Sequence, residues 1–174
     1  PTFPYLDGGV SISRTVRNFP MYLLFKPAMF ITSYLLIRYW LNTKNIINNF
    51  NRDYKNKKKI VFFGVGSAIL LSVHALFLGV KFEYDIYKLF RRVVMLSFII
   101  FELIAQGMLV YHFFKIKEKL SKFINKKVLI FKALLVSVLS IVAILSLPIL
   151  LNKGNTHFKH ALEWNFFVGV IVFY

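Results

Sequence analysis

The chain contains 174 residues, of which 57% are apolar and 17% charged, and it carries a formal net charge of +16. A soluble domain is usually about half apolar and about one quarter charged. The basic residues stand in blocks between apolar stretches of bilayer length, whereas a nucleic-acid-binding surface gathers them on one exposed face. This pattern indicates an integral membrane protein and argues against a nucleic-acid partner. Because the chain has no cysteine, disulfides, thiolate metal sites and a cysteine nucleophile are excluded.

The apolar stretches predict an all-α fold, a polytopic transmembrane helical bundle, in which residues 1–174 form a single transmembrane domain. Residues 1–19 are polar and rich in turn-forming residues, which predicts an outer loop at the membrane surface. Four complete spans and one truncated span are expected, at about 21–41, 60–80, 93–114, 128–151 and 160–174. Since the last stretch is cut at Tyr174, we expect the chain to be an excerpt of a longer protein.

Three basic residues lie within the ends of these spans. Lys26 and Arg38 flank the short charge-free centre of the first span, and Lys132 lies close to the start of the fourth. Long basic side chains near the end of a membrane helix can extend toward the interface and keep their charge in water. We therefore expect all three to reach an interface.

The loops 42–59 and 115–127 fall on one side of the predicted bundle, and each contains six lysines and arginines. The opposite side carries eight in total, so the positive-inside bias places these two loops in the cytoplasm. The second loop alternates apolar residues at helical spacing with lysines. It is either a basic amphipathic helix that contacts lipid headgroups or a solvated extension of the third helix. The headgroup contacts would be Lys115, Lys117, Lys119, Lys122, Lys126 and Lys127.

Five polar residues fall where lipid is expected. An ionisable residue near the bilayer centre costs roughly 2.5–3.5 kcal/mol, so each such group needs a partner. Glu102 lies about 15 Å deep in the third span, and Gln106 shares its helical face. His74 lies near the outer end of the second span, and His160 and Glu163 begin the fifth.

We expect these five residues to converge on one polar pocket in the outer half of the bundle. Such a pocket could bind a metal, relay protons or hold a lipid headgroup. The candidate metal ligands, His74, Glu102, His160 and Glu163, lack the compact HExxH or ExxH spacing of zinc and di-iron centres, so no metal or other cofactor is predicted. The alternative is structural, with a neutral Glu102 that hydrogen-bonds within the bundle.

Small residues form a stripe along the second span and predict that a neighbouring helix approaches closely there. The stripe consists of Gly64, Ala68, Ser72, Ala75 and Gly79.

Several short motifs resemble those of the damage-regulated autophagy modulator (DRAM) family and its relatives. Ser11-Ile12-Ser13-Arg14 followed by Phe19-Pro20 resembles the family's first outer loop, and Leu36-Ile37-Arg38-Tyr39 resembles the end of its second helix. His157 or His160 followed by Ala161-Leu162-Glu163-Trp164 is similar to a motif of the last helix. Arg14 replaces the family's acidic residue. The resemblance implies six spans and a lipid-associated protein, and it supplies no catalytic residue.

The leading hypothesis is therefore a protein that handles lipid or organises the membrane through the outer polar pocket, with membrane lipids as its partners. One alternative is an accessory subunit whose helices complete a larger membrane complex. The other is a membrane enzyme that uses the same polar residues with a metal or haem. The sequence does not name a substrate.

Overall fold

The computed structural model describes residues 3–16, 19–50, 57–78, 84–117, 124–151 and 154–174. Throughout these ranges the regular structure is helical, and no strand occurs in them. The helices are, in chain order, α1 (Pro4–Asp7), α2 (Ile12–Thr15), α3 (Met21–Phe50), α4 (Lys57–Phe77), α5 (Asp85–Lys115), α6 (Lys126–Leu151) and α7 (Thr156–Phe173). The predicted all-α class is thus confirmed.

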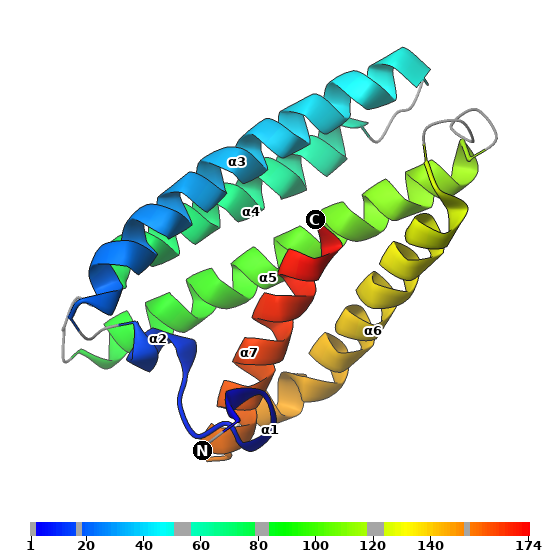
Figure 1. Ribbon diagram of the computed structural model, residues 1–174. Helices are drawn as coiled ribbons and strands as arrows, with labels where there is room; N and C mark the ends of the chain where they lie inside the picture. The colour runs from blue at the N-terminus through cyan, green and yellow to red at the C-terminus, as the bar shows by residue number, and fades with distance from the viewer. Residues whose placement is uncertain (1–2, 17–18, 51–56, 79–83, 118–123, 152–153) are drawn as a thin grey trace.

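Five long helices form the body of the protein (Figure 1). Helices α3 and α4 lie side by side, α4 packs on α5, and α6 and α7 lie beyond α5. The two short helices contact the start of α7, and the chain ends beside the middle of α5. As a result α7 is supported at one end by the N-terminal segment (residues 3–16) and at the other by the centre of the bundle.

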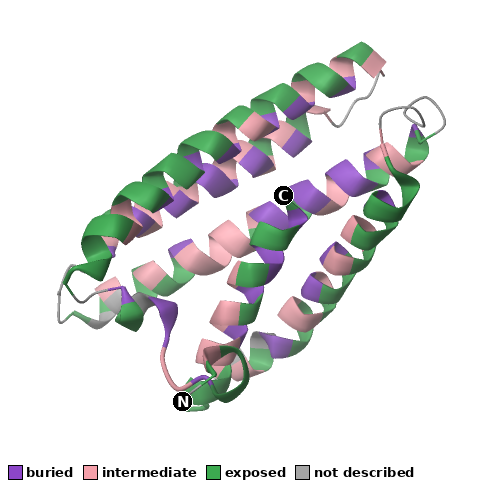
Figure 2. Ribbon diagram, viewed as in Figure 1, coloured by how far each residue is buried: buried purple, intermediate pink, exposed green. Residues whose placement is uncertain are grey.

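Three helices are long and apolar enough to cross a membrane, namely Lys57–Phe77, Leu89–Lys115 and Lys126–Ser146. In the most apolar 18-residue stretch of α6, only 17% of the residues are buried inside the protein. The outer surfaces of α3 and α6 are likewise largely exposed (Figure 2). A soluble protein rarely exposes apolar area of this extent, because it would be unfavourable in water. The exposed helix faces therefore indicate contact with lipid or with further membrane helices.

The helix bounds differ from the predicted spans at two places. Helix α3 continues nine residues beyond position 41, so the prediction that residues 42–50 belong to a loop is wrong. The physical reason is tertiary: Ile47 is completely buried and packs in one cluster with Trp40 and Ile60, which extends the helix past its apolar part. Helix α5 begins at Asp85, eight residues before the predicted span, with a mixed polar and apolar first two turns.

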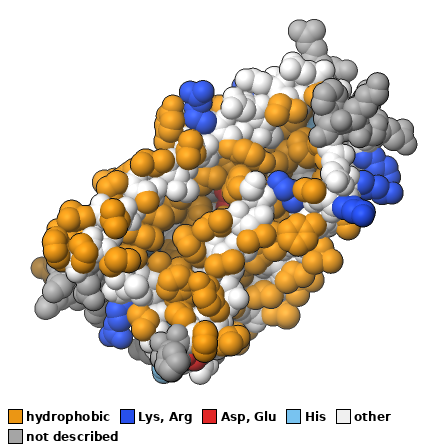
Figure 3. Space-filling model, in the orientation of Figure 1, with side chains coloured by type: hydrophobic (Ala, Val, Ile, Leu, Met, Phe, Trp, Pro, Cys, Tyr) orange, Lys and Arg blue, Asp and Glu red, His pale blue; other side chains and the backbone are white. Residues whose placement is uncertain are grey.

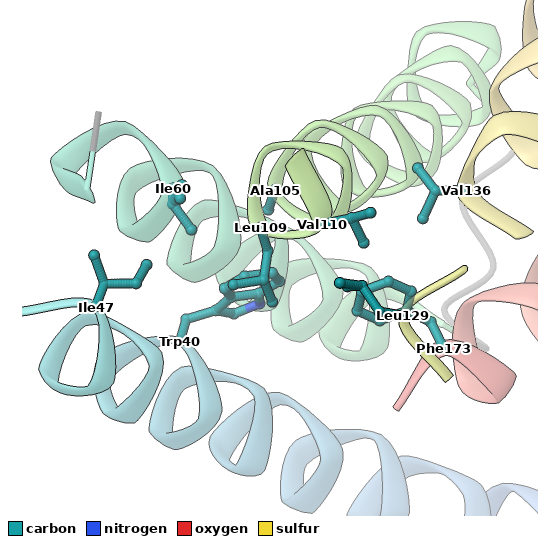
Figure 4. Packing of buried hydrophobic residues seen from close by; sticks show 9 residues of the cluster. All are labelled: Trp40, Ile47, Ile60, Ala105, Leu109, Val110, Leu129, Val136 and Phe173. Carbon is teal, nitrogen blue, oxygen red and sulfur yellow. The ribbon is translucent and has the colours of Figure 1, made fainter. Parts of the chain in front are cut away.

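The main core cluster joins α3, α4, α5, α6 and α7, and Trp40 lies near its centre (Figure 4). The Trp40 ring lies directly over Gly64, because a Cβ atom added there would come within 2.2 Å of Trp40 Cδ2. Ala68 and Ala75 of the small-residue stripe are also completely buried. These residues confirm the predicted close approach of another helix, which is α3. Gly79 lies outside the described residues.

Lys132 does not extend toward an interface as predicted. Its Nζ atom lies 4.5 Å from the ring centroid of Phe173, so the charge rests on an aromatic face of α7. Lys132 shares its helical face with Leu129 and Val136, both of which are core residues that point to the same side of α6 (Figure 4). A cation–π contact of this kind partly offsets the loss of hydration.

We expect Gly64→Ala to destabilise the protein by about 1–3 kcal/mol, because the buried Trp40 ring has no space into which it can move. Gly107→Ala is the matched control, since the nearest atom to its new Cβ would be Val136 Cγ1 at 3.7 Å. This control should be neutral, or more stable by up to about 1 kcal/mol. Thermal unfolding in detergent, followed by circular dichroism, measures both. Equal midpoints for the two variants would contradict the proposed packing.

Candidate functional site

The side chain of Glu102 lies at the centre of the bundle and is completely buried. Its Oε2 atom accepts a hydrogen bond from Ser67 Oγ at 2.5 Å, and Oε1 accepts one from Gln106 Nε2 at 3.0 Å. The hydroxyl of Tyr174 also donates to Oε1. We refer to Ser67, Glu102, Gln106 and Tyr174 as the Glu102 cluster. Its donors come from three helices, so one carboxyl group links α4, α5 and α7.

The sequence positions these groups through helix geometry. Ser67 is the eleventh of the 21 residues of α4, and Glu102 lies near the middle of the 31-residue α5. The two helices pack along their lengths, which brings the two midpoints together. Gln106 follows Glu102 by four residues and therefore shares its helical face. Tyr174 caps the end of α7.

Aromatic rings from α3 close the cluster on its remaining side. The centroids of the Tyr39 and Tyr174 rings lie 4.8 Å apart in an edge-to-face arrangement, and Trp40 contacts both rings. Trp40 Nε1 is buried without a hydrogen-bond partner. Gln106 Oε1 is likewise buried without a hydrogen-bond partner. Two buried polar atoms without hydrogen-bond partners therefore lie at or beside the cluster.

A second polar group fastens the N-terminal segment to α7. His160 Nδ1 lies 3.0 Å from the carbonyl oxygen of Gly8, and Trp164 Nε1 donates to the carbonyl oxygen of Val10 at 2.8 Å. Asn165 Nδ2 donates to the carbonyl oxygen of Tyr5 at 2.9 Å. These contacts join residues of the N-terminal segment to residues of α7 that lie about 150 positions away in the sequence.

Two residues shape the N-terminal segment for this contact. Gly8 has φ +60°, and a Cβ atom there would come within 1.7 Å of the carbonyl oxygen of His157, so only glycine fits. Ser11 is the N-cap of α2, and its Oγ accepts from the backbone amide of Arg14 at 3.2 Å. In this arrangement Arg14 contributes its backbone amide, and its side chain is exposed.

The predicted single pocket is divided between two places. Glu102 and Gln106 lie together at the bundle centre, as their spacing predicted. His160 contacts Gly8 at the start of α7, whereas Tyr174, which contacts Glu102, ends that helix fourteen residues later. At 1.5 Å per residue this separation is about 21 Å, so His160 and Glu102 do not share a pocket. The prediction failed because depth from one membrane face did not reveal which end of α7 reaches α5.

His74 lies apart from both hydrogen-bonded groups. His74 lies two turns beyond Ser67 on the same face of α4, and its Nδ1 is buried without a hydrogen-bond partner. Arg91 of α5 is the charged group that acts on it. Glu163 is half-buried in the first half of α7. Within the described residues, no three His, Cys, Asp or Glu side chains gather closely enough to hold a metal ion.

The predicted headgroup lysines lie at the end of the bundle where α5 ends and α6 begins. Those within the described residues are exposed: Lys115, Lys117, Lys126 and Lys127. Lys119 and Lys122, with most of the predicted amphipathic helix, lie outside the described residues.

One face of the protein is hollowed between α3 and α7 (Figure 3). Its walls carry hydrophobic side chains, and acidic atoms are visible at its bottom. The hollow overlies the middle of α5 (Figure 1), a part of the helix in which residues 95–99 are all partly exposed. We call this feature the lateral hollow. At one end Tyr39 and Tyr174 meet across it.

The other end of the lateral hollow is closed by a small apolar cluster. Ile12, Val16 and Leu78 are buried there, and Phe25 and Phe167 pack against them. The N-terminal segment therefore lies between α3 and α7 at this end of the hollow, and Tyr39 of α3 meets Tyr174 of α7 near the bundle centre. The hollow between them is open on the face drawn in Figure 3.

No protein-family model, curated protein or solved structure matches this chain. The interpretation of both polar groups and of the lateral hollow therefore depends on their own residues and geometry.

We expect Gly8→Ala to detach the N-terminal segment from α7, because the new methyl group would overlap the backbone of His157. Gly154→Ala is the matched control: its φ of +110° imposes a similar backbone cost, but no atom lies within 4 Å. Trypsin should cleave after the exposed Arg14 several-fold faster in the Gly8 variant than in the control or the wild type. Unchanged cleavage in the Gly8 variant would show that the segment does not depend on this contact.

Proposed function

We propose that this chain is a multi-pass membrane protein that binds lipid, with an acyl chain in the lateral hollow and a membrane-organising or lipid-handling role. The observation that carries the proposal is the hollow itself, whose walls carry hydrophobic side chains. Because such a surface is unfavourable in water and, in this proposal, opens toward the bilayer, an acyl chain is the ligand that its chemistry favours.

The resemblance to the DRAM family supports the same role without establishing it. Its outer-loop and last-helix motifs lie far apart in sequence, yet His160 and Trp164 bind the backbone of the N-terminal segment. Contact between these motifs is what a shared fold would require. In this proposal α3 and α7 also cross the membrane, which gives four complete spans and a fifth formed by α7, within the six-span arrangement that the resemblance implies.

A second candidate is an accessory subunit of a larger membrane complex. The observation that favours it is the outer face of α6, which is the most apolar of the long helices and is largely uncovered. A neighbouring membrane helix could cover this face as readily as lipid. Copurification of a second membrane protein in stoichiometric amount would support this candidate.

The lateral hollow can be tested with a phospholipid that carries a photoactivatable group on its acyl chain. Met95 is partly exposed and lies on the same face of α5 as Glu102, so in this proposal Met95→Trp should fill the hollow and lower crosslinking there several-fold. Ile100→Trp is the matched control, because Ile100 is 47% exposed and points about 140° away from Met95 around α5. Peptide mass spectrometry locates the crosslinks.

If crosslinks fall on the outward face of α6 alone, and Met95→Trp has no more effect than Ile100→Trp, the hollow is not a lipid site. A loss of crosslinking in both variants would indicate general misfolding, which size-exclusion chromatography would detect separately.

The proposed orientation has the loops 42–59 and 115–127 in the cytoplasm, because these loops are the more basic. The chain has no cysteine, so single cysteines can be introduced without background. In intact cells an impermeant maleimide should label Asn155→Cys, and should label Asn49→Cys only after permeabilisation. Both positions are exposed in the structure. The reverse labelling pattern would invert the topology.

A further inference from the structure

The charge of Glu102 is not balanced by any basic side chain in the described part of the chain. The carboxyl group is completely buried, and its hydrogen-bond donors are Ser67, Gln106 and Tyr174, all of them neutral. A bare carboxylate in an apolar interior is costly even when it accepts hydrogen bonds. Charge neutrality at this position therefore requires a cation that is not part of the described chain.

The cluster offers the ligands that a small hard cation prefers. Both carboxyl oxygens, Ser67 Oγ and the Tyr174 hydroxyl oxygen converge within hydrogen-bonding contact. Gln106 Oε1 is fully buried and has no hydrogen-bond partner. Hydroxyl groups can turn so that their oxygens face a cation. The unused amide oxygen is an independent indication that an electropositive species belongs at this site.

We propose that the Glu102 cluster is a reversible binding site for a monovalent cation, a sodium ion or a proton. A divalent ion is disfavoured because a single carboxylate would leave a net positive charge in the bundle interior. The proton and the sodium ion satisfy the same requirement, since each neutralises one carboxylate among oxygen ligands. This inference does not depend on lipid binding in the lateral hollow.

The effect of ionising Glu102 can be distinguished by experiment from the effects of the other titratable groups around the cluster. The two nearest are phenols, Tyr39 and Tyr174, which ordinarily ionise only in alkaline solution. Lys132 approaches from α6 but rests on Phe173. The histidines are farther along the helices, with His74 two turns from Ser67 and His112 ten residues from Glu102. Glu102→Gln leaves all of these groups in place, so it isolates the carboxyl group.

Trp40 provides a local reporter. The chain has two tryptophans, so Trp164→Phe leaves Trp40, which lies beside the carboxyl group, as the only one. The experiment uses this variant in detergent or nanodiscs. One arm adds sodium chloride against choline chloride at equal ionic strength, and the other varies pH in the absence of sodium. Infrared difference spectra of the same samples follow the carbonyl stretch of a protonated carboxylic acid.

We expect the fluorescence of Trp40 to change saturably in at least one arm, and Glu102→Gln to abolish that change while the protein stays monodisperse. A response to sodium alone assigns the sodium ion, a response to pH alone assigns the proton, and mutual displacement assigns competition for one site. Ser67→Ala removes one ligand and should weaken binding about fivefold, as expected for the loss of one hydrogen-bonding group.

The inference is overturned if neither fluorescence nor the infrared carbonyl band responds to sodium or to pH in the Trp40-only protein. That result would make Glu102 a permanently protonated structural acid. It is likewise overturned if the response persists unchanged in Glu102→Gln, because the cation would then act elsewhere. Neither result would affect lipid crosslinking in the hollow, so the two proposals fail independently.

Discussion

One carboxyl group sets the arrangement of the helices. Glu102 lies in an interior that offers no water, so its oxygens must be satisfied by donors from neighbouring helices. Those donors are Ser67 of α4, Gln106 of α5 and Tyr174 of α7. Apolar packing alone tolerates rotation and sliding of helices, since lipid and leucine are equally apolar. The hydrogen bonds of Glu102 are directional, and they favour the contact between the midpoints of α4 and α5 and the position of Tyr174 beside them.

The fold class followed from composition and hydropathy, because bilayer-length apolar runs allow few structures other than membrane helices. The helix ends were less predictable. Residues 42–50 are polar enough to read as a loop, yet Ile47 packs against Ile60 and Trp40 and keeps α3 helical. Likewise Lys132 appeared able to reach the interface, whereas the ring of Phe173 holds it inside. Both outcomes are decided by tertiary neighbours that periodicity within one helix does not reveal.

The candidate site was likewise predictable only within a single helix. Glu102 and Gln106 share a face by spacing alone, and burial cost marked Glu102 as a residue that needs partners. The partners themselves were missed, because Ser67 resembles an ordinary packing serine and Tyr174 lies at the end of the sequence. The one feature of the sequence that could have drawn attention to Ser67 is its position seven residues before His74, which places both side chains on one face of α4. His160 was assigned to the wrong partner because depth does not specify which helices are neighbours.

Helix α7 connects the two polar groups with the lateral hollow between them. Its outer end is held by backbone oxygens of the N-terminal segment, and its inner end by Glu102 and the rings of Tyr39 and Trp40. Between these ends α7 forms one wall of the hollow without being packed tightly against α3. The position of that wall is therefore set at two points. The end at the bundle centre carries the Glu102 carboxyl group, which accepts the hydrogen bond from Tyr174, and the other end carries the imidazole of His160. The proposed cation site therefore lies at one end of the proposed lipid site, although each can exist without the other.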